Sequence, residues 1–122
     1  MSVGMPRRRV LFIEDEAALR QSYERAFHAR YEAAYAATGQ EALRLLRDHK
    51  PEVAVLDLRL PDTDGVNLLR QLRAEQPSLA VVVTSAYLSM EPQLAVLGLS
   101  HSGYLVKPFD LAVLAARIDA AR

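Results

Sequence analysis

Cysteine is absent from the 122-residue sequence, which excludes disulfide frameworks, thiolate metal sites and cysteine nucleophiles. Neither charge is in excess, because fifteen Lys and Arg residues balance fifteen Asp and Glu residues. There is therefore no electrostatic case for direct binding to nucleic acid or to an anionic membrane. No apolar run approaches the roughly 18–20 residues of a membrane span, and the first residues lack the apolar core of a signal peptide. We expect a cytoplasmic protein.

Short apolar runs alternate with segments of helical periodicity along the chain. The runs predict strands at Val10–Ile13, Tyr31–Ala36, Val53–Leu56, Ala80–Val83 and Gly103–Val106. The periodic segments predict helices at Ala17–Ala29, from Thr38 to Pro51, from Gly65 to Pro77, around Pro92–Leu97, and from Asp110 onward. This order predicts an α/β fold, a doubly wound five-stranded parallel sheet flanked by five helices. We expect one domain over residues 1–122, with residues 1–8 as a flexible leader.

Particular residues mark the helix ends. Thr38 and Glu41 have the spacing of a capping box, and Asp110 stands where it could cap the last helix. Pro92 is expected at the first helical position, where proline is favoured. The last helix is expected to carry four apolar residues, Leu111, Val113, Leu114 and Ile118.

Polar side chains follow four of the five predicted strands. Glu14 and Asp15 come after the first strand, Asp57 after the third, Ser85 after the fourth and Lys107 after the fifth. Because the carboxyl ends of parallel strands meet at one edge of a sheet, we expect these side chains to gather there. Two charges about 4 Å apart repel by about 4 kcal/mol at an effective dielectric near 20. Three carboxylates at one edge therefore favour a divalent cation such as Mg²⁺.

The same edge suits a phosphoryl group. The Lys107 ammonium and a metal would attract it, Ser85 would offer a hydroxyl to one of its oxygens, and Asp57 is a plausible nucleophile. Any one of these residues alone would more often be a helix cap, a turn residue or a surface lysine. Their joint placement at the ends of different strands carries the hypothesis.

The motifs at the strand ends resemble those of the receiver domain of two-component response regulators. The resemblance covers essentially the whole chain and rests on four stretches in order: Val10–Glu16, Val55–Gly65, Val83–Ala86 and Tyr104–Phe109. It implies a flavodoxin-like fold of the receiver type. It also implies a phosphorylation-dependent signalling switch, not an enzyme acting on other substrates, that catalyses only its own phosphorylation and dephosphorylation.

The resemblance assigns roles to individual residues. It implies three catalytic residues: Asp57 as phosphoacceptor, with Lys107 and Ser85. It implies four oxygen donors to Mg²⁺ or Mn²⁺: the carboxylates of Glu14, Asp15 and Asp57 and the backbone carbonyl of Arg59. It makes Ser85 and Tyr104 the switch residues, and it makes Arg59 and Tyr87 residues that tune the lifetime of the phosphate. It also implies a cis peptide bond between Lys107 and Pro108.

The resemblance implies partners as well. The phosphoryl donor would be a histidine kinase or a phosphotransfer protein, or a small phosphodonor. The signal would leave through the face made by the fourth helix, the fifth strand and the last helix. It would reach a downstream protein partner, or an output domain missing from this sequence. The chain is expected to be a monomer or a weak phosphorylation-dependent dimer.

The sequence departs from the pattern of the family at three places, one of which is Ser100–Gly103 in place of the usual small-residue, acidic loop before the fifth strand. Glu14 replaces the more common Asp in the acidic pair, and its longer side chain is expected to reach the metal through water. Asp62 stands in a turn where glycine is frequent, so it adds a carboxylate just outside the site.

Two alternative functions from other classes remain open. One is a flavodoxin-like module that binds a nucleotide or a flavin. The first predicted strand disfavours it, because that strand leads into carboxylates and not into a phosphate-cradling loop. The other is a phosphatase that uses Asp57 as its nucleophile on a separate substrate. It would need substrate-selecting insertions, and every predicted connection is short.

Overall fold

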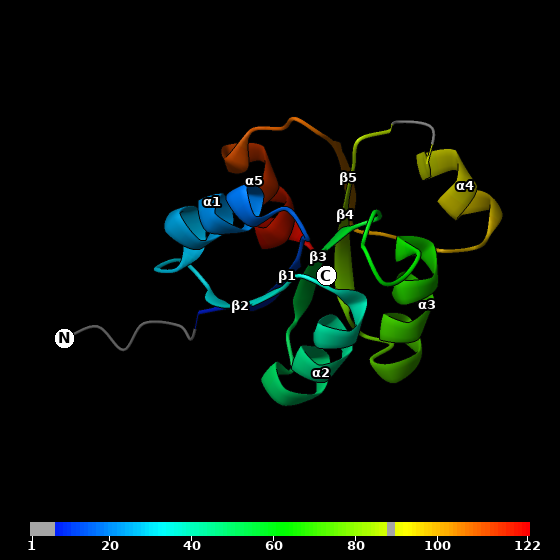
Figure 1. The fold of residues 1–122 in the computed structure, drawn as a ribbon, viewed down its shortest axis with the longest axis horizontal. Helices are drawn as coiled ribbons and strands as arrows, with labels where there is room; N and C mark the ends of the chain where they lie inside the picture. Colours follow the sequence, from blue (N-terminus) through cyan, green and yellow to red (C-terminus); the bar gives the residue numbers. More distant parts are fainter. Residues whose placement is uncertain (1–6, 88–89) are drawn as a thin grey trace.

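The structure is a computed structural model that describes residues 7–87 and 90–122. Strands and helices alternate along the chain (Figure 1), in the order β1 (Arg9–Ile13), α1 (Ala17–Phe27), β2 (Glu32–Ala36), α2 (Gly39–His49), β3 (Val53–Asp57), α3 (Gly65–Glu75), β4 (Ala80–Ser85), α4 (Met90–Val96), β5 (Gly103–Val106) and α5 (Leu111–Ala120). This is the predicted strand–helix alternation. None of the helices in the described ranges combines the length and apolar character needed to cross a bilayer.

The five strands form one sheet in the order β2-β1-β3-β4-β5, and every neighbouring pair is parallel. The predicted α/β fold is therefore confirmed. Helices α1 and α5 cover one face of the sheet, and α2, α3 and α4 cover the other (Figure 1). The central strand β3 is buried along its whole length, as an apolar run covered on both faces should be.

Alternate residues of β1 enter two separate cores, because successive side chains of a strand point to opposite faces. Leu11 packs with the α2–α4 side, whereas Phe12 packs with α1 and α5. The ring of Phe12 lies 5.5 Å from that of Phe27 and 5.0 Å from that of Tyr23, centroid to centroid. Aromatic contacts thus fix α1 against the sheet just below the strand ends.

Two of the predicted strands extend further than expected. Strand β3 ends at Asp57 and β4 ends at Ser85, so both polar residues belong to the sheet. In the register between these strands, Asp57 lies opposite Thr84. The ladder therefore holds the backbone of each in place, which a loop position would not do.

The predicted helix caps have different outcomes. The capping box of α2 is confirmed, because Thr38 Oγ1 accepts a 3.1 Å hydrogen bond from Glu41 N. Glu41 Oε1 reaches back to the N–H of Ala37 at 2.8 Å. The prediction for α5 is wrong in part, since Asp110 occupies the N-cap position but its exposed side chain makes no capping hydrogen bond.

Two smaller predictions need correction or refinement. Helix α4 already includes Met90, so Pro92 lies in its first turn and not at its first position. A proline is tolerated there because the first four N–H groups of a helix have no partner within it. Val113 is 43% exposed, whereas Leu114 is fully buried. The buried stripe of α5 runs through Leu114, Ala115 and Ile118, which turns Val113 outward.

Of the leader expected at residues 1–8, residues 1–6 lie outside the described ranges, and residues 7 and 8 contact the domain. The carbonyl of Arg8 accepts a 3.0 Å hydrogen bond from Glu32 N, and its guanidinium donates to Ile118 O at 2.5 Å. Arg7 donates to the carbonyls of His28 and Ala29. Residues 7 and 8 are therefore fixed to the domain.

Candidate functional site

An acidic cluster lies at the carboxyl edge of the sheet, where the sequence predicted one. Glu14 and Asp15 follow β1, and Asp57 ends the neighbouring strand β3. Their carboxylates each offer an oxygen, and these oxygens lie within 4.8 Å of one another. Glu14 and Asp57 are 1% and 3% exposed, whereas Asp15 faces solvent. The cluster is thus buried on one side and open on the other.

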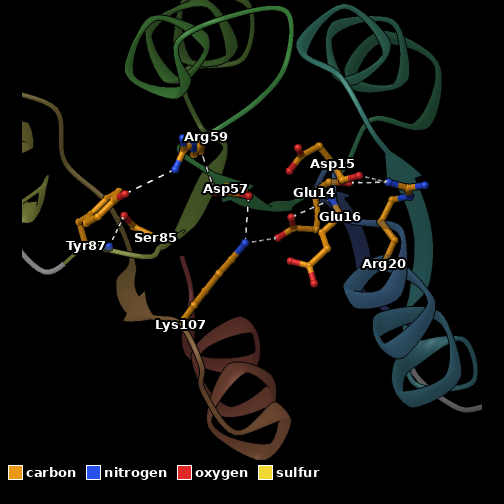
Figure 2. A network of polar contacts seen from close by, with 9 residues as sticks. All are labelled: Glu14, Asp15, Glu16, Arg20, Asp57, Arg59, Ser85, Tyr87 and Lys107. Carbon is orange, nitrogen blue, oxygen red and sulfur yellow. Dashed lines mark hydrogen bonds and ion pairs between the residues drawn. The ribbon is translucent and has the colours of Figure 1, made fainter.

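Lys107 supplies the positive charge of this cluster. Strand β5 ends at Val106, and the following Lys107–Pro108 peptide bond is cis, as expected. The Nζ atom lies 2.8 Å from Glu14 Oε1 and 3.0 Å from Asp57 Oδ2. Figure 2 shows the side chain reaching between the two carboxylates. Burial alone would lower the pKa of Lys107, but the two carboxylates outweigh it and hold that pKa above its ordinary value.

The second oxygen of Asp57 has its own partner. Arg59 N donates a 3.0 Å hydrogen bond to Asp57 Oδ1. The carboxylate is therefore held at both oxygens, by a backbone N–H on one side and by an ammonium on the other. Such bonds fix the rotamer of a side chain, so Asp57 is presented to the cavity in one orientation.

Glu14 has a strongly perturbed pKa. Burial raises its pKa to about 7, the ion pair with Lys107 opposes the rise, and the nearby Asp57 adds to it. Burial disfavours a charged carboxylate, and a second carboxylate close by disfavours it further. One ammonium therefore does not neutralise this cluster.

The donor set fits a hard divalent cation. Three carboxylates face one ammonium, and oxygen ligands of this kind suit Mg²⁺ or Ca²⁺. Among the described residues, no group donates a hydrogen bond to the Asp15 carboxylate, so its oxygens are available to an ion. The acidic cluster could thus hold a metal.

Arg20 was not predicted as part of the site. From the first turns of α1 it donates hydrogen bonds to the carbonyls of Glu14 (3.0 Å) and Asp15 (2.8 Å), as Figure 2 shows. Glu16 N donates to Glu14 Oε2 at 3.1 Å. Together these bonds fix the turn that carries the acidic pair. An arginine one helical turn beyond Glu16 was the only signal in the sequence, and such spacing is common on solvated helix faces.

The predicted switch residues meet at Tyr87 and not at Asp57. The hydroxyl of Ser85 accepts a 3.0 Å hydrogen bond from Tyr87 N. The hydroxyl of Tyr104 donates a 2.5 Å hydrogen bond to the carbonyl of Tyr87. Burial raises the pKa of Tyr104. The backbone of Tyr87 therefore connects the two switch positions.

The predicted tuning residues contact each other. Arg59 Nη1 lies 3.4 Å from the Tyr87 hydroxyl, which is a weak hydrogen bond across the mouth of the site (Figure 2). Both line a cavity of about 610 Å³ that also contains Asp15, Asp57, Ser85 and Lys107. Tyr104 is not among the residues that line it. The sequence could not show that these two side chains touch.

Another cavity, of about 750 Å³, opens at the opposite edge of the sheet among arginines and Lys50. Several of its charged side chains already have partners within the protein. Arg47 forms a double hydrogen bond with Glu75, and Arg9 donates to the carbonyl of Lys50. Basic side chains also lie favourably beside the carboxyl ends of helices. This cavity carries no functional assignment.

Comparison with known proteins agrees with this geometry. The family model of the response regulator receiver domain matches residues 10–119. The transcriptional regulatory protein PrrA of Mycobacterium tuberculosis is 39% identical over 121 residues, which are 98% of this chain and 52% of PrrA. The response regulator MprA of Mycolicibacterium vanbaalenii is 36% identical over 113 residues, 92% of this chain and 49% of MprA. The chain thus spans about half the length of the curated relatives that it matches.

Solved structures share the fold. A CheY-like receiver domain protein of Methanospirillum hungatei superposes with a TM-score of 0.84 at 26% identity, over 93% of this chain and 91% of that protein. A response regulator of Burkholderia pseudomallei, solved with a phosphorylated aspartic acid, a calcium ion and citrate, gives a TM-score of 0.79 at 26% identity, over 90% and 65% of the two chains. The chain belongs to the receiver domain family of two-component response regulators.

Proposed function

We propose that this receiver domain works as a phosphorylation switch with Asp57 as its phosphoacceptor. One observation carries the proposal: the Asp57 carboxylate ends the central strand, opens into the cavity, and is held between the Lys107 ammonium and the N–H of Arg59. The Burkholderia regulator, whose structure contains a phosphorylated aspartic acid, supports the same chemistry. In this family the chemistry serves signalling, and the protein transforms no separate substrate.

Mg²⁺ or Mn²⁺ is the proposed cofactor. Glu14, Asp15 and Asp57 would hold it, together with the backbone carbonyl of Arg59. When bound, the ion would neutralise charge on the phosphoryl oxygens during transfer. Glu14 is tied to Lys107 and to Glu16 N, which supports a contact to the ion through water for this residue.

Lys107 and Asp57 would carry out the transfer itself. An oxygen of Asp57 attacks the phosphorus of a phosphohistidine, an oxygen–phosphorus bond forms, and the phosphorus–nitrogen bond breaks. The imidazole that leaves takes up a proton from solvent. The Lys107 ammonium then pairs with a phosphoryl oxygen, and it keeps Glu14 as its second partner. Hydrolysis returns the protein to its unphosphorylated state. Water attacks the phosphorus, and phosphate is released from the Asp57 carboxylate.

Ser85 would respond to the negative charge of the phosphoryl group. Phosphorylation adds about −1.5 to −2 charges, and a hydroxyl can turn to donate to a phosphoryl oxygen. The Ser85 hydroxyl would then give up its present bond from Tyr87 N, which shifts the Tyr87 backbone and frees the hydroxyl of Tyr104. The ring of Tyr104 would turn inward, and the surface formed by α4, β5 and α5 would change.

The proposed partners follow from the family. A histidine kinase or a phosphotransfer protein would donate the phosphoryl group, in the cytoplasm. PrrA is named as a transcriptional regulator and is about twice as long as the matched segment, which supports an output domain or a separate downstream protein as the receiver of the signal. No direct contact of this chain with nucleic acid or membrane is proposed. The oligomeric state is proposed to be a monomer or a weak dimer formed on phosphorylation.

The two alternative functions gain no supporting observation. Strand β1 leads into Glu14 and Asp15, where a flavin or nucleotide module would need a phosphate-cradling loop. The connections between strands and helices are short, which leaves no insertion to select the substrate of a phosphatase.

The test is labelling with acetyl phosphate or phosphoramidate in the presence of Mg²⁺, read by intact mass. We expect the wild type to gain one phosphoryl group and Asp57→Asn to gain none. Asp15→Asn, which leaves the nucleophile in place but removes an acid of the cluster, should label slowly. Removal of Mg²⁺ with a chelator should also stop the labelling. Equal labelling of wild type and Asp57→Asn would overturn the proposal.

A further inference from the structure

Asp62 lies in the loop from β3 to α3 but bonds to a different helix. Its Oδ1 accepts a 2.8 Å hydrogen bond from Gly39 N, and its Oδ2 accepts a 3.0 Å hydrogen bond from Gln40 N. Both donors belong to the first turn of α2, whose N–H groups have no partner within the helix. These two backbone bonds lower the pKa of Asp62 below its ordinary value. One carboxylate thus spans two elements with both of its oxygens.

The loop is also packed closely onto the start of α2. A Cβ atom at position 39 would lie 2.5 Å from Thr63 Cγ2 and 3.4 Å from Asp62 Oδ1. A larger residue at position 39 would therefore have to displace the Thr63 side chain. The loop and the helix are therefore joined by hydrogen bonds and are also closely packed.

Asp62 acts beside the N-cap residue of α2 and does not replace it. Thr38 accepts from Glu41 N, and Glu41 accepts from Ala37 N. Asp62 accepts from the two N–H groups that these bonds leave unpaired, those of Gly39 and Gln40. The contact therefore completes the helix end and ties the loop to it.

The other end of the loop is closed on itself, next to Asp57. Arg59 pairs with Asp64 in an antiparallel bridge, and Gly65 N donates to Leu58 O at 3.1 Å. Asp57 Oδ1 receives its hydrogen bond from Arg59 N, in the first part of this loop. The loop thus has a closed base at the acidic cluster and one tether at its tip, which is Asp62.

We propose that Asp62 is a positioning residue for the cation site: its two bonds to α2 hold the β3–α3 loop, and with it the Arg59 backbone, in register with the acidic cluster. The inference rests on the proposed function, in which the Arg59 carbonyl is a metal ligand. It deepens that function by making α2 part of the support of the site. Without the tether the loop tip moves, and the carbonyl loses its fixed place.

The experiment compares Mg²⁺ binding by calorimetry in Asp62→Ala and in Thr38→Ala. Both variants remove acceptors from the first turn of α2, two bonds in Asp62→Ala and one in Thr38→Ala, so both should lower the melting temperature. Only Asp62→Ala releases the loop. We expect its Mg²⁺ affinity to fall by about tenfold, the low end of the effects seen when groups that orient metal ligands are removed. Thr38→Ala should bind Mg²⁺ within about twofold of the wild type.

A conservative variant sharpens the comparison. Asp62→Asn keeps one acceptor oxygen and one of the two bonds, so its affinity should lie between those of the wild type and Asp62→Ala. An unchanged affinity in Asp62→Ala would overturn the inference, as would an equal loss in Thr38→Ala or a wild type that binds no Mg²⁺. Failure of Asp57 to take up phosphate, with the tenfold loss still seen, would overturn the proposed function alone.

Discussion

Lys107 and Asp57 form an ion pair at the edge of the sheet, 3.0 Å from Nζ to Oδ2, in which both partners come from the ends of strands that are not neighbours. Glu14 shares the same ammonium at 2.8 Å. The Lys107 ammonium thus offsets part of the negative charge of an acidic cluster whose members belong to separate segments of the chain. Lys107 should consequently matter for stability as well as for phosphoryl transfer.

Lys107→Met should destabilise the metal-free protein and make it more responsive to Mg²⁺. Removing one partner of a buried ion pair costs about 3–5 kcal/mol, and the partial exposure of Lys107 places the cost near the lower end. A loss of about 3 kcal/mol lowers the melting temperature by about 10 °C in a domain of this size. Mg²⁺ should raise the melting temperature of the variant more than that of the wild type, because it replaces the missing positive charge.

Lys50→Met is the matched control for that experiment. Lys50 lines the cavity at the opposite edge of the sheet, away from the acidic cluster. Its replacement should leave the response to Mg²⁺ as in the wild type. A Lys107→Met protein that melts like the wild type and gains no more from Mg²⁺ would contradict the role given to the ion pair.

Ser85→Ala should separate phosphorylation from its structural consequence. Ser85 accepts the N–H of Tyr87 but makes no hydrogen bond to Asp57, so the variant should still be labelled by acetyl phosphate. The change that labelling causes in hydrogen exchange of α4 and β5 should be smaller than in the wild type, because no hydroxyl moves to the phosphoryl group. Exchange is measured with and without the phosphodonor.

Thr84→Val tests the choice between two adjacent hydroxyls. Thr84 is buried, and its Oγ1 has no hydrogen-bond partner within residues 7–87 and 90–122. Replacing an unpaired buried hydroxyl by a methyl group is close to neutral or stabilising. This variant should keep the full exchange response. Loss of the response in Thr84→Val but not in Ser85→Ala would reverse the assignment.

The sequence predicted the sheet because its strands are short continuous apolar runs. Such runs are typical of parallel strands that are covered on both faces. It also predicted that Glu14, Asp57 and Lys107 meet, since parallel strands bring their carboxyl ends to one edge. These predictions depend only on chain direction and burial. The capping hydrogen bond expected from Asp110 is not formed. Such a bond depends on a side-chain rotamer, which the sequence pattern does not specify.

Other contacts had no distinctive signal in the sequence. Asp62 bonds to Gly39 across 23 residues, and Arg20 bonds to the carbonyls behind it. Both contacts involve backbone groups, which are the same at every position and leave no trace in a residue pattern. The contact between Arg59 and Tyr87 likewise depends on how far two long side chains reach. The supporting contacts of the site therefore had to come from coordinates.

Arg59→Ala and Tyr87→Ala should each shorten the lifetime of the phosphate without preventing its formation. The two side chains meet across the mouth of the cavity, so losing either one opens a path for water to the phosphoryl group. We expect hydrolysis to be severalfold faster in each single variant. The double variant should be little faster than either, because each single change already breaks the shared contact. Decay of the labelled protein after removal of the phosphodonor measures the rates.

Val113→Ala serves as the control for these rates, since Val113 is an exposed residue of α5 that does not line the cavity. Its decay should match that of the wild type. If Arg59→Ala and Tyr87→Ala also decay at the rate of the wild type, neither residue tunes the lifetime.

Asp119 gives the stability of the fold a defined dependence on pH. Its Oδ1 accepts a 2.7 Å hydrogen bond from the Tyr31 hydroxyl, and its Oδ2 pairs with Arg30, which ties α5 to the turn before β2. Burial alone would raise the pKa of Asp119, but the bonds from Tyr31 and Arg30 outweigh it and hold that pKa below its ordinary value. A carboxylate whose pKa is lowered in the folded state stabilises the fold at any pH above its unfolded-state pKa. This stabilisation is lost as the pH falls through the folded-state pKa.

Asp119→Asn should therefore melt below the wild type at neutral pH, by about 3–5 °C for a loss of about 1 kcal/mol. The difference should be complete above about pH 5 and should shrink as the pH falls below the unfolded pKa of about 3.9. Asp48→Asn is the control, because Asp48 makes an exposed pair with Arg44 at 3.8 Å and such pairs contribute little. A difference between wild type and Asp119→Asn that stayed constant down to pH 2 would show that the carboxylate charge is not what holds α5.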